Sequence, residues 1–324
     1  MPLDIGPAMV WILDHYRTRS QRESKMSTGC VHINGEFVEL EDAKISIFDT
    51  GFLHSDVVYD VTTSWKGYVF KLDEHLERFA ASCAGFKLKN PYSNDETKAL
   101  LAECTVRAGC EDGAFIHMHV TRGEYPEGSR DPRLCENQFA CYVVPYVWLW
   151  GEEKSKAGIN IHMADIERIS SNAVDARFKN FHWGDLIQAQ YEAYEAGRDD
   201  AALCAADGNL AEGPGFNIWV VKDGVCATPD ANCLLGMSRK SVIELCGMEG
   251  IPYETRTVHP DELRGADEAF ATSSAGGVLP ITRVDDKPLG NGAMGIVTSQ
   301  LFDSYWRNRE AGWCGTKISD LLDS

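Results

Sequence analysis

The amino-acid sequence predicts an α+β fold, in which strands and helices follow one another without strict βαβ alternation. Two observations carry this prediction. Short turns at Asn34-Gly35, Lys66-Gly67 and Asp223-Gly224 each separate two strand-like stretches, which is typical of β-hairpins. Helical periodicity appears between these hairpins. No internal repeat or low-complexity tract interrupts the pattern, so we expect an ordinary globular protein.

The first half of the chain is expected to contain two hairpins, two helices and two longer strands. The hairpin CVHI-NGE-FVEL is followed by a second one, with VTTSW before its turn and YVFKL after it. Asp73 is expected to cap a helix whose apolar residues recur at helical spacing. Another helix is expected over 94–108. Strands at 114–121 and 138–147 then enclose a polar loop.

A charged segment divides the chain. GEEKSKAG is bounded by glycine and lacks periodicity, as is typical of a linker. Beyond it we expect a strand, a helix at 184–196, further strands with a helix near 237–247, and a last helix at 295–309. The predicted division is therefore an N-terminal extension (1–28), a small α/β domain (29–150), the linker (151–158) and a larger domain (159–324).

Composition excludes several classes of partner. The net charge of −18 argues against binding to nucleic acid or to an anionic membrane, because both require a basic surface. The eleven cysteines are scattered and form no C-x-x-C pair, which indicates reduced thiols and a cytoplasmic location. The first twenty residues lack a basic region before their apolar stretch, and no apolar run is long enough to span a bilayer.

Most standard catalytic signatures are absent from the sequence, including the P-loop, G-x-S-x-G, H-E-x-x-H and the dinucleotide-binding glycine motif. His117 and His119 alternate on a predicted strand, so both point to one face. Such a pair could bind a metal, but no nearby residue completes a ligand set. We therefore predict no metal and interpret both as pocket or wall residues.

Lys179 is the candidate for covalent chemistry. It lies in the heptapeptide RFKNFHW, with aromatic residues on both sides. Aromatic neighbours predict a half-buried amine, and burial of a lysine favours its neutral, nucleophilic form. Schiff-base chemistry requires such an amine. A solvated surface lysine is the alternative interpretation.

Three further segments could bind an anionic, ring-shaped ligand. Glu212 ends a predicted strand and is followed by glycines that let backbone approach a ligand, although a surface turn is an alternative. The sequence LGMSRK begins a helix, where free N–H groups and the Ser238 hydroxyl suit a phosphate. The TSSAGG segment at 272–277 offers a second turn rich in hydroxyl groups.

In this order, the segments resemble the class-IV, fold-type-IV aminotransferases that depend on pyridoxal 5′-phosphate (PLP). The resemblance extends from about residue 29 to about residue 309. It rests on ISIFDTGFLHSDVVYDVTTSW, FKLDEHLERF, HVTRG, ARFKNFHWGDL, LAEGPGFNIWVVKDGV, GMSRKSV and TSSAGGVLPIT. HSDVVYDV, KNFHWGDL and AEGPGFN are most similar to (R)-selective amine transaminases. D-amino-acid and branched-chain aminotransferases are relatives.

The resemblance implies a fold, a reaction and an assembly. The fold would be a small N-terminal α/β domain plus a larger C-terminal pseudo-barrel domain, in a homodimer with shared active sites. The enzyme would move an amino group from an (R)-amine or D-like amino donor to a 2-keto acid such as pyruvate, in a ping-pong mechanism. A D-amino-acid or branched-chain aminotransferase, a PLP lyase of the same fold, a PLP-binding protein without activity and a metal-binding protein remain alternatives.

The resemblance also implies residue roles. Lys179 would form the Schiff base with PLP and later move the proton, and Glu212 would pair with the pyridine nitrogen. The remaining cofactor-binding residues would be Arg78, Leu234, Met237, Ser238, Ser273 and Ser274.

The substrate pocket is where the sequence departs from the similar (R)-amine transaminases. They usually carry other residue types at His117 and His119. We expect the pocket to include His54, Tyr59, His117, Arg130 and Trp183. Packing roles for His54 and Tyr59 remain open. Arg130 is the expected receiver of the keto-acid carboxylate from a mobile loop, with Arg133 or a solvated arginine as the alternatives.

Overall fold

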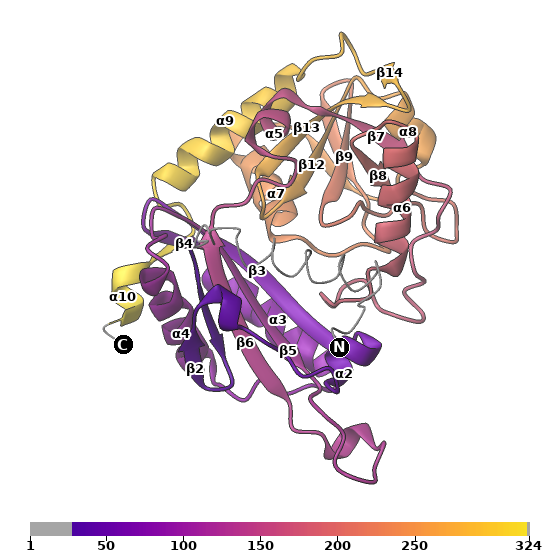
Figure 1. Ribbon diagram of the computed structural model, residues 1–324. Coiled ribbons are helices and arrows are strands. Elements are labelled where there is room, and N and C mark those ends of the chain that lie inside the picture. Colours follow the sequence, from indigo (N-terminus) through magenta and orange to yellow (C-terminus); the bar gives the residue numbers. More distant parts are fainter. Residues whose placement is uncertain (1–27, 323–324) are drawn as a thin grey trace, which may run out of the picture.

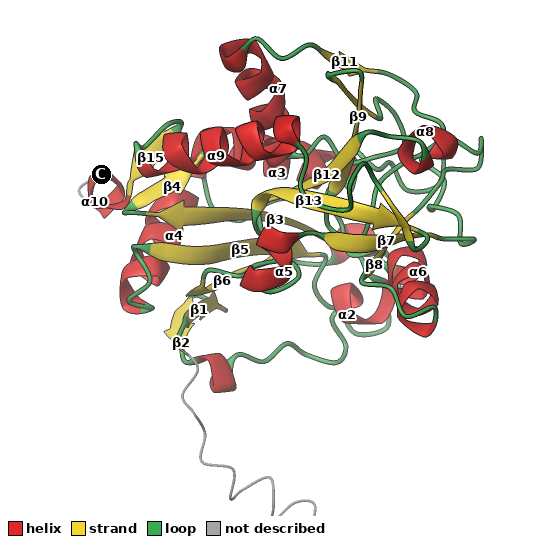
Figure 2. Cartoon of the chain, turned by 90° about the horizontal axis from the view of Figure 1, so that it is seen from above, coloured by secondary structure: helices red, strands yellow, loops and turns green. Residues whose placement is uncertain are grey.

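The computed structural model describes residues 28–322. The N-terminal extension predicted for 1–28 therefore lies outside the described residues, except for its last residue. The chain forms two sheets with helices packed on them, and these confirm the α+β fold (Figures 1 and 2). No helix in the described part of the chain is long and apolar enough to cross a membrane.

The first sheet has seven strands in the order β15-β4-β3-β5-β6-β1-β2 (Figure 1). Their bounds are β1 Cys30–Ile33, β2 Glu36–Val38, β3 Val57–Trp65, β4 Tyr68–Phe70, β5 Gly113–Thr121, β6 Gln138–Pro145 and β15 Gly315–Lys317. Each pairing in this sheet is antiparallel. The hairpins predicted at Asn34-Gly35 and Lys66-Gly67 are confirmed, and all four turn residues have φ between 51° and 81°.

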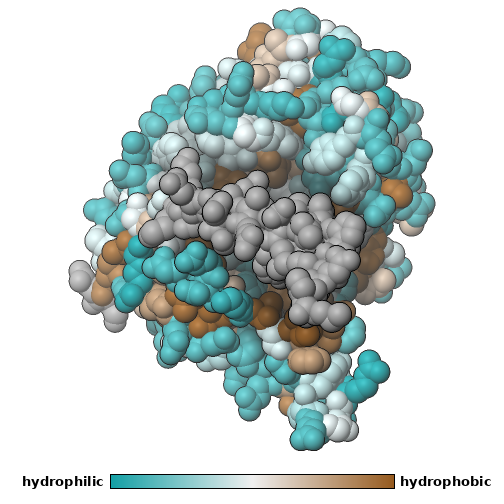
Figure 3. Space-filling model, in the orientation of Figure 1, coloured by the Kyte–Doolittle hydropathy of each residue, from teal (hydrophilic) through white to brown (hydrophobic). Residues whose placement is uncertain are grey.

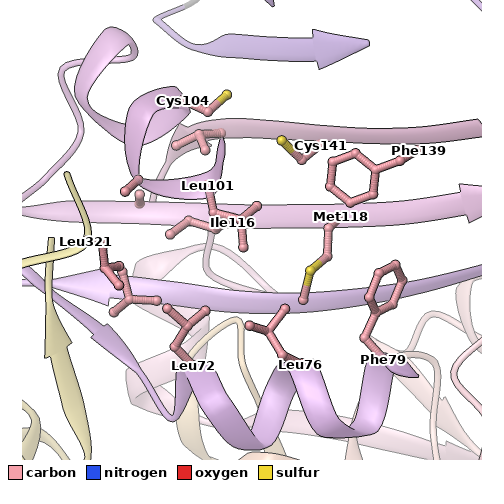
Figure 4. Packing of buried hydrophobic residues seen from close by; sticks show 14 of the residues in the cluster. Leu72, Leu76, Phe79, Leu101, Cys104, Ile116, Met118, Phe139, Cys141 and Leu321 are labelled. Carbon is pink, nitrogen blue, oxygen red and sulfur yellow. The ribbon is translucent and has the colours of Figure 1, made fainter. Parts of the chain in front are cut away.

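Helices cover one face of this sheet and enclose its core. They are α3 (Leu72–Gly85), α4 (Asn94–Arg107) and α10 (Ile318–Leu322). Figure 4 shows Leu76 of α3 and Leu101 of α4 packed against Ile116 and Met118 of β5. Because side chains alternate along a strand, His117 between them points to the opposite face. That face is left for the functional site.

The predicted helix starts need one correction and one addition. Lys71, with a φ of 45°, is the N-cap of α3 and makes no side-chain capping bond, so Asp73 lies inside the first turn instead of capping it. There its negative charge still suits the positive end of the helix dipole. The helix expected from position 94 begins there, and Ser93 caps it in a capping box with Glu96.

The second sheet has eight strands and mixed pairing, with the path β11-β10-β9-β12-β13-β7-β8 and β14 beside β13. The bounds are β7 Ile159–Met163, β8 Asp200–Ala202, β9 Asn217–Lys222, β10 Val225–Thr228, β11 Tyr253–Thr255, β12 Glu268–Ser273, β13 Gly277–Val284 and β14 Lys287–Pro288. Both faces of its central strands are buried: Ile218 and Ala271 lie in one apolar cluster, Trp219 and Phe270 in another.

Longer helices flank the second sheet. They are α6 (Gly184–Glu195), α7 (Met237–Glu249) and α9 (Ile296–Glu310). The shorter ones are α2 (Thr50–His54), α5 (Glu152–Ala157) and α8 (Pro260–Arg264), with two 3-10 turns, η1 (Leu40–Asp42) and η2 (Pro132–Leu134). The segment interpreted as a linker thus contains α5.

The chain returns to the first sheet at its C-terminal end, because β15 pairs with β4 and α10 contacts α4. The buried guanidinium of Arg309, on α9, donates hydrogen bonds to the Thr63 hydroxyl at 3.3 Å and to the Tyr305 hydroxyl at 3.1 Å. The end of the predicted larger domain therefore packs on the small one, and α9 ties the two sheets together.

Candidate active site

A cavity of about 930 Å³ is lined by residues from both sheets. It meets the face of β3, β5 and β6 that the helices leave free. Eleven of the thirteen predicted site residues line it: Tyr59, Arg78, His117, Lys179, Trp183, Glu212, Leu234, Met237, Ser238, Ser273 and Ser274. Residues more than 200 positions apart in the sequence therefore meet at one site.

His54 and Arg130 do not line this cavity. His54 is the exposed last residue of α2, and its ring lies near Tyr125, 6.5 Å away between centroids. Arg130 is exposed on the loop between β5 and β6, which extends away from the body of the chain (Figure 1). Sequence position could not show that both side chains lie on the outer surface.

Lys179 is fixed through its backbone to the first sheet, although it lies between elements of the second. Within residues 28–322, β4 pairs only with the C-terminal end of β3, and residues 179–181 lie beside its N-terminal half, where Asn180 forms a bridge with Val58. The Tyr59 N–H donates to the Lys179 carbonyl at 3.0 Å, and the Lys179 N–H donates to the Ser82 hydroxyl at 3.0 Å. The amine lies 4.2 Å from the centroid of the Tyr59 ring. No carboxylate among the described residues pairs with it, so the amine is available for a covalent bond.

Arg78 is held in place by a buried carboxylate that the sequence analysis missed. Asp60, fully buried on β3, accepts hydrogen bonds from Nε and Nη2 of Arg78 at 2.8 Å each. His75 Nδ1 lies 2.7 Å from the same carboxylate. Burial alone would raise the pKa of Asp60, but Arg78 and His75 hold that pKa below its usual range. The third nitrogen, Nη1 of Arg78, donates to the Leu235 carbonyl at 3.2 Å, so the guanidinium reaches the loop before α7.

Glu212 is also buried, and a second arginine accompanies it. Its carboxylate accepts hydrogen bonds from Arg168 Nε at 3.0 Å and from the Leu234 N–H at 2.9 Å. Burial raises the pKa of Glu212, while Arg168, Leu234 and Lys179 act in the opposite direction. Arg168 is itself held by Asp185 at 2.6 Å. The sequence analysis did not single out Arg168, which lies in a stretch without a recognisable motif.

The start of α7 provides an anion site. Gly236 is the N-cap and supplies no side-chain acceptor, so the first N–H groups, those of Met237 and Ser238, have no partner within the helix. The Ser238 side chain is buried, and no described residue hydrogen-bonds its hydroxyl. A Cβ at Gly236 would lie 2.2 Å from Asn217 Oδ1, so glycine is required for this close approach.

Ser273 and Ser274 connect the two halves of the cavity. The Ser273 hydroxyl donates to the Gly215 carbonyl at 3.0 Å. The Ser274 hydroxyl donates to the Val61 carbonyl on β3 at 3.1 Å. Both hydroxyl protons are therefore already used between protein groups, and the Ser273 oxygen also accepts a hydrogen bond from the Ala275 N–H at 3.2 Å.

The arrangement fits PLP. The free N–H groups of α7 and the guanidinium of Arg78 lie together and suit a phosphate. The Glu212 carboxylate could receive the protonated ring nitrogen, and Leu234, whose N–H donates to that carboxylate, would pack on the ring. Lys179 offers the unpaired amine that would bond the aldehyde carbon. The geometry thus defines a PLP-binding site of the kind used for reactions at amino groups.

Comparison with known proteins gives the family. Residues 57–284 match the model of amino-transferase class IV. The chain is 31% identical to D-alanine aminotransferase of Bacillus licheniformis over 273 residues, covering 84% of this chain and 94% of that protein. It is 30% identical to branched-chain-amino-acid aminotransferase of Pseudomonas aeruginosa over 290 residues, 86% and 92% of the two chains.

Solved structures agree with this assignment. A T.th. branched-chain amino acid aminotransferase with pyridoxamine 5′-phosphate superposes with a TM-score of 0.83 at 25% identity, over 91% of this chain and all of that one. The archaeal enzyme of Thermoproteus uzoniensis with norvaline gives 0.81 at 26% identity, over 89% and 99%. The chain therefore belongs to the class IV aminotransferases. It is a PLP-dependent aminotransferase of the branched-chain or D-amino-acid type.

Proposed function

We propose that this enzyme transfers an amino group from an (R)-configured amine or D-like amino donor to a 2-keto acid such as pyruvate, in two successive half-reactions. One observation carries the proposal. Each arginine that lines the cavity is already engaged by carboxylates: Arg78 by Asp60, and Arg168 by Glu212 and Asp185. A cavity without an unpaired guanidinium accepts a donor with an uncharged side group without burying an unpaired arginine charge.

Each site residue has a role in this proposal. PLP supplies the electron sink that stabilises negative charge on the reacting carbon. Lys179 would hold the cofactor, and its amine, once free, would move the proton from the reacting carbon. Glu212 would keep the ring nitrogen protonated, and Arg168 counteracts the effect of burial on the pKa of Glu212. Arg78 and the first turn of α7 would bind the phosphate and so hold the cofactor in one position during the reaction.

Other donors are the main alternative. The curated relatives include both D-alanine and branched-chain aminotransferases at similar identity, so either donor class fits the comparisons about as well. A PLP lyase would use the same lysine and carboxylate, but it would release ammonia without needing a keto acid.

A donor panel tests the proposal. Both enantiomers of an apolar amine, of alanine and of leucine are each offered with pyruvate and with 2-oxoglutarate, and the new amino acid is quantified. We expect the (R)-amine or the D-amino acid to react fastest and pyruvate to be accepted. Preference for L-leucine with 2-oxoglutarate would instead support a branched-chain enzyme, and ammonia release without keto acid would support a lyase.

Arg130 is the proposed receiver of the keto-acid carboxylate. Arg133, its rival on the loop, is paired with Asp131 at 2.6 Å, whereas Arg130 has no ion pair with any described residue. Arg130→Ala should raise KM for pyruvate about 10- to 150-fold, corresponding to about 1.5–3 kcal/mol for a charge-assisted hydrogen bond. The half-reaction with an apolar amine should stay nearly unchanged. Stopped-flow measurement of each half-reaction separates the two effects.

Arg133→Ala is the matched control, because it removes the same charge from the same loop. It should leave both half-reactions intact. Equal damage to both half-reactions by Arg130→Ala would indicate a structural role, and a larger effect of Arg133→Ala on pyruvate would move the assignment to that residue.

We also propose that the enzyme is a homodimer. Apolar side chains gather on the lower part of the face shown in Figure 3, and the exposed ones near α2 are Ile45, Ile47, Phe48, Phe52 and Leu53. Ile45 and Phe52 also line the cavity. An exposed apolar surface beside an active site suits a second copy that completes the wall. A monomeric mass in light scattering of the active enzyme would contradict this.

A further inference from the structure

Two histidines on β5 form part of the cavity wall without a role in the proposed reaction. His117 is 6% exposed and its ring is stacked between Tyr59, at 5.1 Å, and Tyr142, at 4.6 Å between centroids. The ring of His119 lies 5.5 Å from that of His117. Both side chains line the cavity, and His119 also lines a neighbouring cavity of about 540 Å³. They are therefore wall residues and not part of the helix-covered core.

The imidazole nitrogens of His117 and His119 make no hydrogen bond within the described part of the chain. No described residue hydrogen-bonds either nitrogen of His117 or His119, and both Nδ1 atoms are closed off from solvent. Burial lowers the pKa of His117 well below its usual value and that of His119 to about 4. The carboxylate of Asp60 acts on His117 in the opposite direction, but Lys179 and His119 reinforce the effect of burial. Both rings are therefore neutral near pH 7.

The burial of Nδ1 determines where the single N–H of each neutral ring lies. A buried N–H without an acceptor is rarely tolerated, whereas a lone pair without a donor is less costly. The proton therefore belongs on Nε2, the nitrogen that is not closed off. Each ring then presents an N–H donor and no charge to the cavity. No group of three ligating side chains that could hold a metal ion occurs among residues 28–322.

We propose that His117 and His119 determine specificity by donating hydrogen bonds to a neutral acceptor oxygen in the side group of the amino donor. The preferred donors would carry an ether, ester or amide carbonyl oxygen near the reacting carbon, instead of a pure hydrocarbon or a cationic group. A hydrocarbon side group would leave the N–H groups of both histidines without an acceptor and shielded from water. A cationic side group would face two N–H donors and the nearby Lys179 amine, which all repel positive charge. This inference rests on the proposed transaminase function and names the class of side group that the site selects.

Isosteric donor pairs provide the test. O-methylserine and norvaline differ only by an ether oxygen in place of a methylene, and so do 1-methoxy-2-propylamine and 2-aminopentane. The donor half-reaction is followed in single turnover with each member, in both enantiomers, and the ratio of kcat/KM within a pair is the readout. The wild-type enzyme should favour the ether about tenfold, the size expected for a hydrogen bond made to an otherwise unpaired group.

The variants assign the preference to the two rings. His117→Phe keeps an aromatic ring between the two tyrosines but removes one of the two N–H groups, so the ratio should fall from about ten to about three. His119→Phe provides a second, independent reduction, and His117→Gln, which keeps a donor, should restore part of the preference. His32→Phe is the matched control, because His32 is also buried with an unpartnered Nδ1 but lines neither cavity. Its ratio should equal that of the wild type.

The outcomes separate this inference from the proposed function. A wild-type enzyme that uses both members of a pair equally, or a ratio that both phenylalanine variants leave unchanged, would overturn the role of the histidines alone. If His117→Phe slowed only the keto-acid half-reaction, the ring would bind the acceptor carboxylate and the inference would be wrong. A wild-type enzyme inactive with every donor would overturn the proposed function itself.

Discussion

Replacement of Lys179 by alanine should lower kcat for amino transfer by about a thousandfold or more, because the same amine forms the covalent link and moves the proton. The cofactor should still bind, since the residues proposed to hold its phosphate and ring remain: Arg78, Glu212 and the first turn of α7. Steady-state rates with the best donor of the panel, together with the ratio of bound cofactor to protein, measure both effects.

Lys179→Arg sharpens this test, because it keeps a positive charge beside Tyr59 but supplies no amine. It should be as inactive as the alanine variant. Lys44→Ala is the matched control: Lys44 also lines the cavity, but it is exposed and faces Asp42 at 3.7 Å. It should keep most of the wild-type activity. A Lys179 variant that still turned over at the wild-type rate would remove the residue from the mechanism.

The Glu212→Gln variant should keep its cofactor and lose about 100-fold or more in kcat, the usual scale for one lost electrostatic contact at a developing charge. A neutral amide does not hold the proton on the ring nitrogen, so negative charge on the reacting carbon is less stabilised. Arg168 retains Asp185 at 2.6 Å, which limits damage to the fold. Single-turnover rates of proton removal give the loss directly.

Glu167→Gln provides the control for this change, because Glu167 is an exposed carboxylate beside Arg168 in the sequence. It should leave kcat unchanged. An unchanged kcat in Glu212→Gln would mean that Glu212 serves only to position Arg168 and Leu234.

Much of the fold was predictable because local signals sufficed. The glycine turns at positions 35, 67 and 224 have positive φ, as hairpins of this kind require. The periodic segments became helices close to their expected bounds. The predicted start of α3 was wrong in detail, because Lys71 and not Asp73 is the N-cap. The left-handed backbone conformation of Lys71 leaves no signal in the sequence.

Site residues that lie in a recognisable motif could be predicted from the sequence. Those that reach the site only through tertiary packing could not. Lys179 and Glu212 lie in distinctive segments and both line the cavity. Arg168 carries no motif and reaches Glu212 through the segment between them in space: the Arg168 N–H donates to the Cys204 carbonyl, and the Leu203 N–H donates to the Glu212 carbonyl. Asp60 offered one signal that was not used, a carboxylate within an otherwise uncharged strand, VVYDVTTSW, which in a buried strand requires a cationic partner.

Two of the predicted pocket residues differ from the others in their placement. His54 and Arg130 belong to segments that resemble pocket segments of the family, yet both side chains are exposed and outside the cavity lining of this chain. A sequence pattern places a residue on a segment, but it does not fix the direction of a loop that few contacts hold.

Peptide mapping after borohydride reduction tests the central claim, that this cavity carries PLP on Lys179, most directly. Reduction makes the bond between the amine and the cofactor permanent, so digestion and mass spectrometry locate it. The cofactor mass should appear on the peptide that contains Lys179, with the protein losing its visible absorbance and its activity together. Label on any other lysine, or none at all with cofactor present and activity intact, would contradict this account.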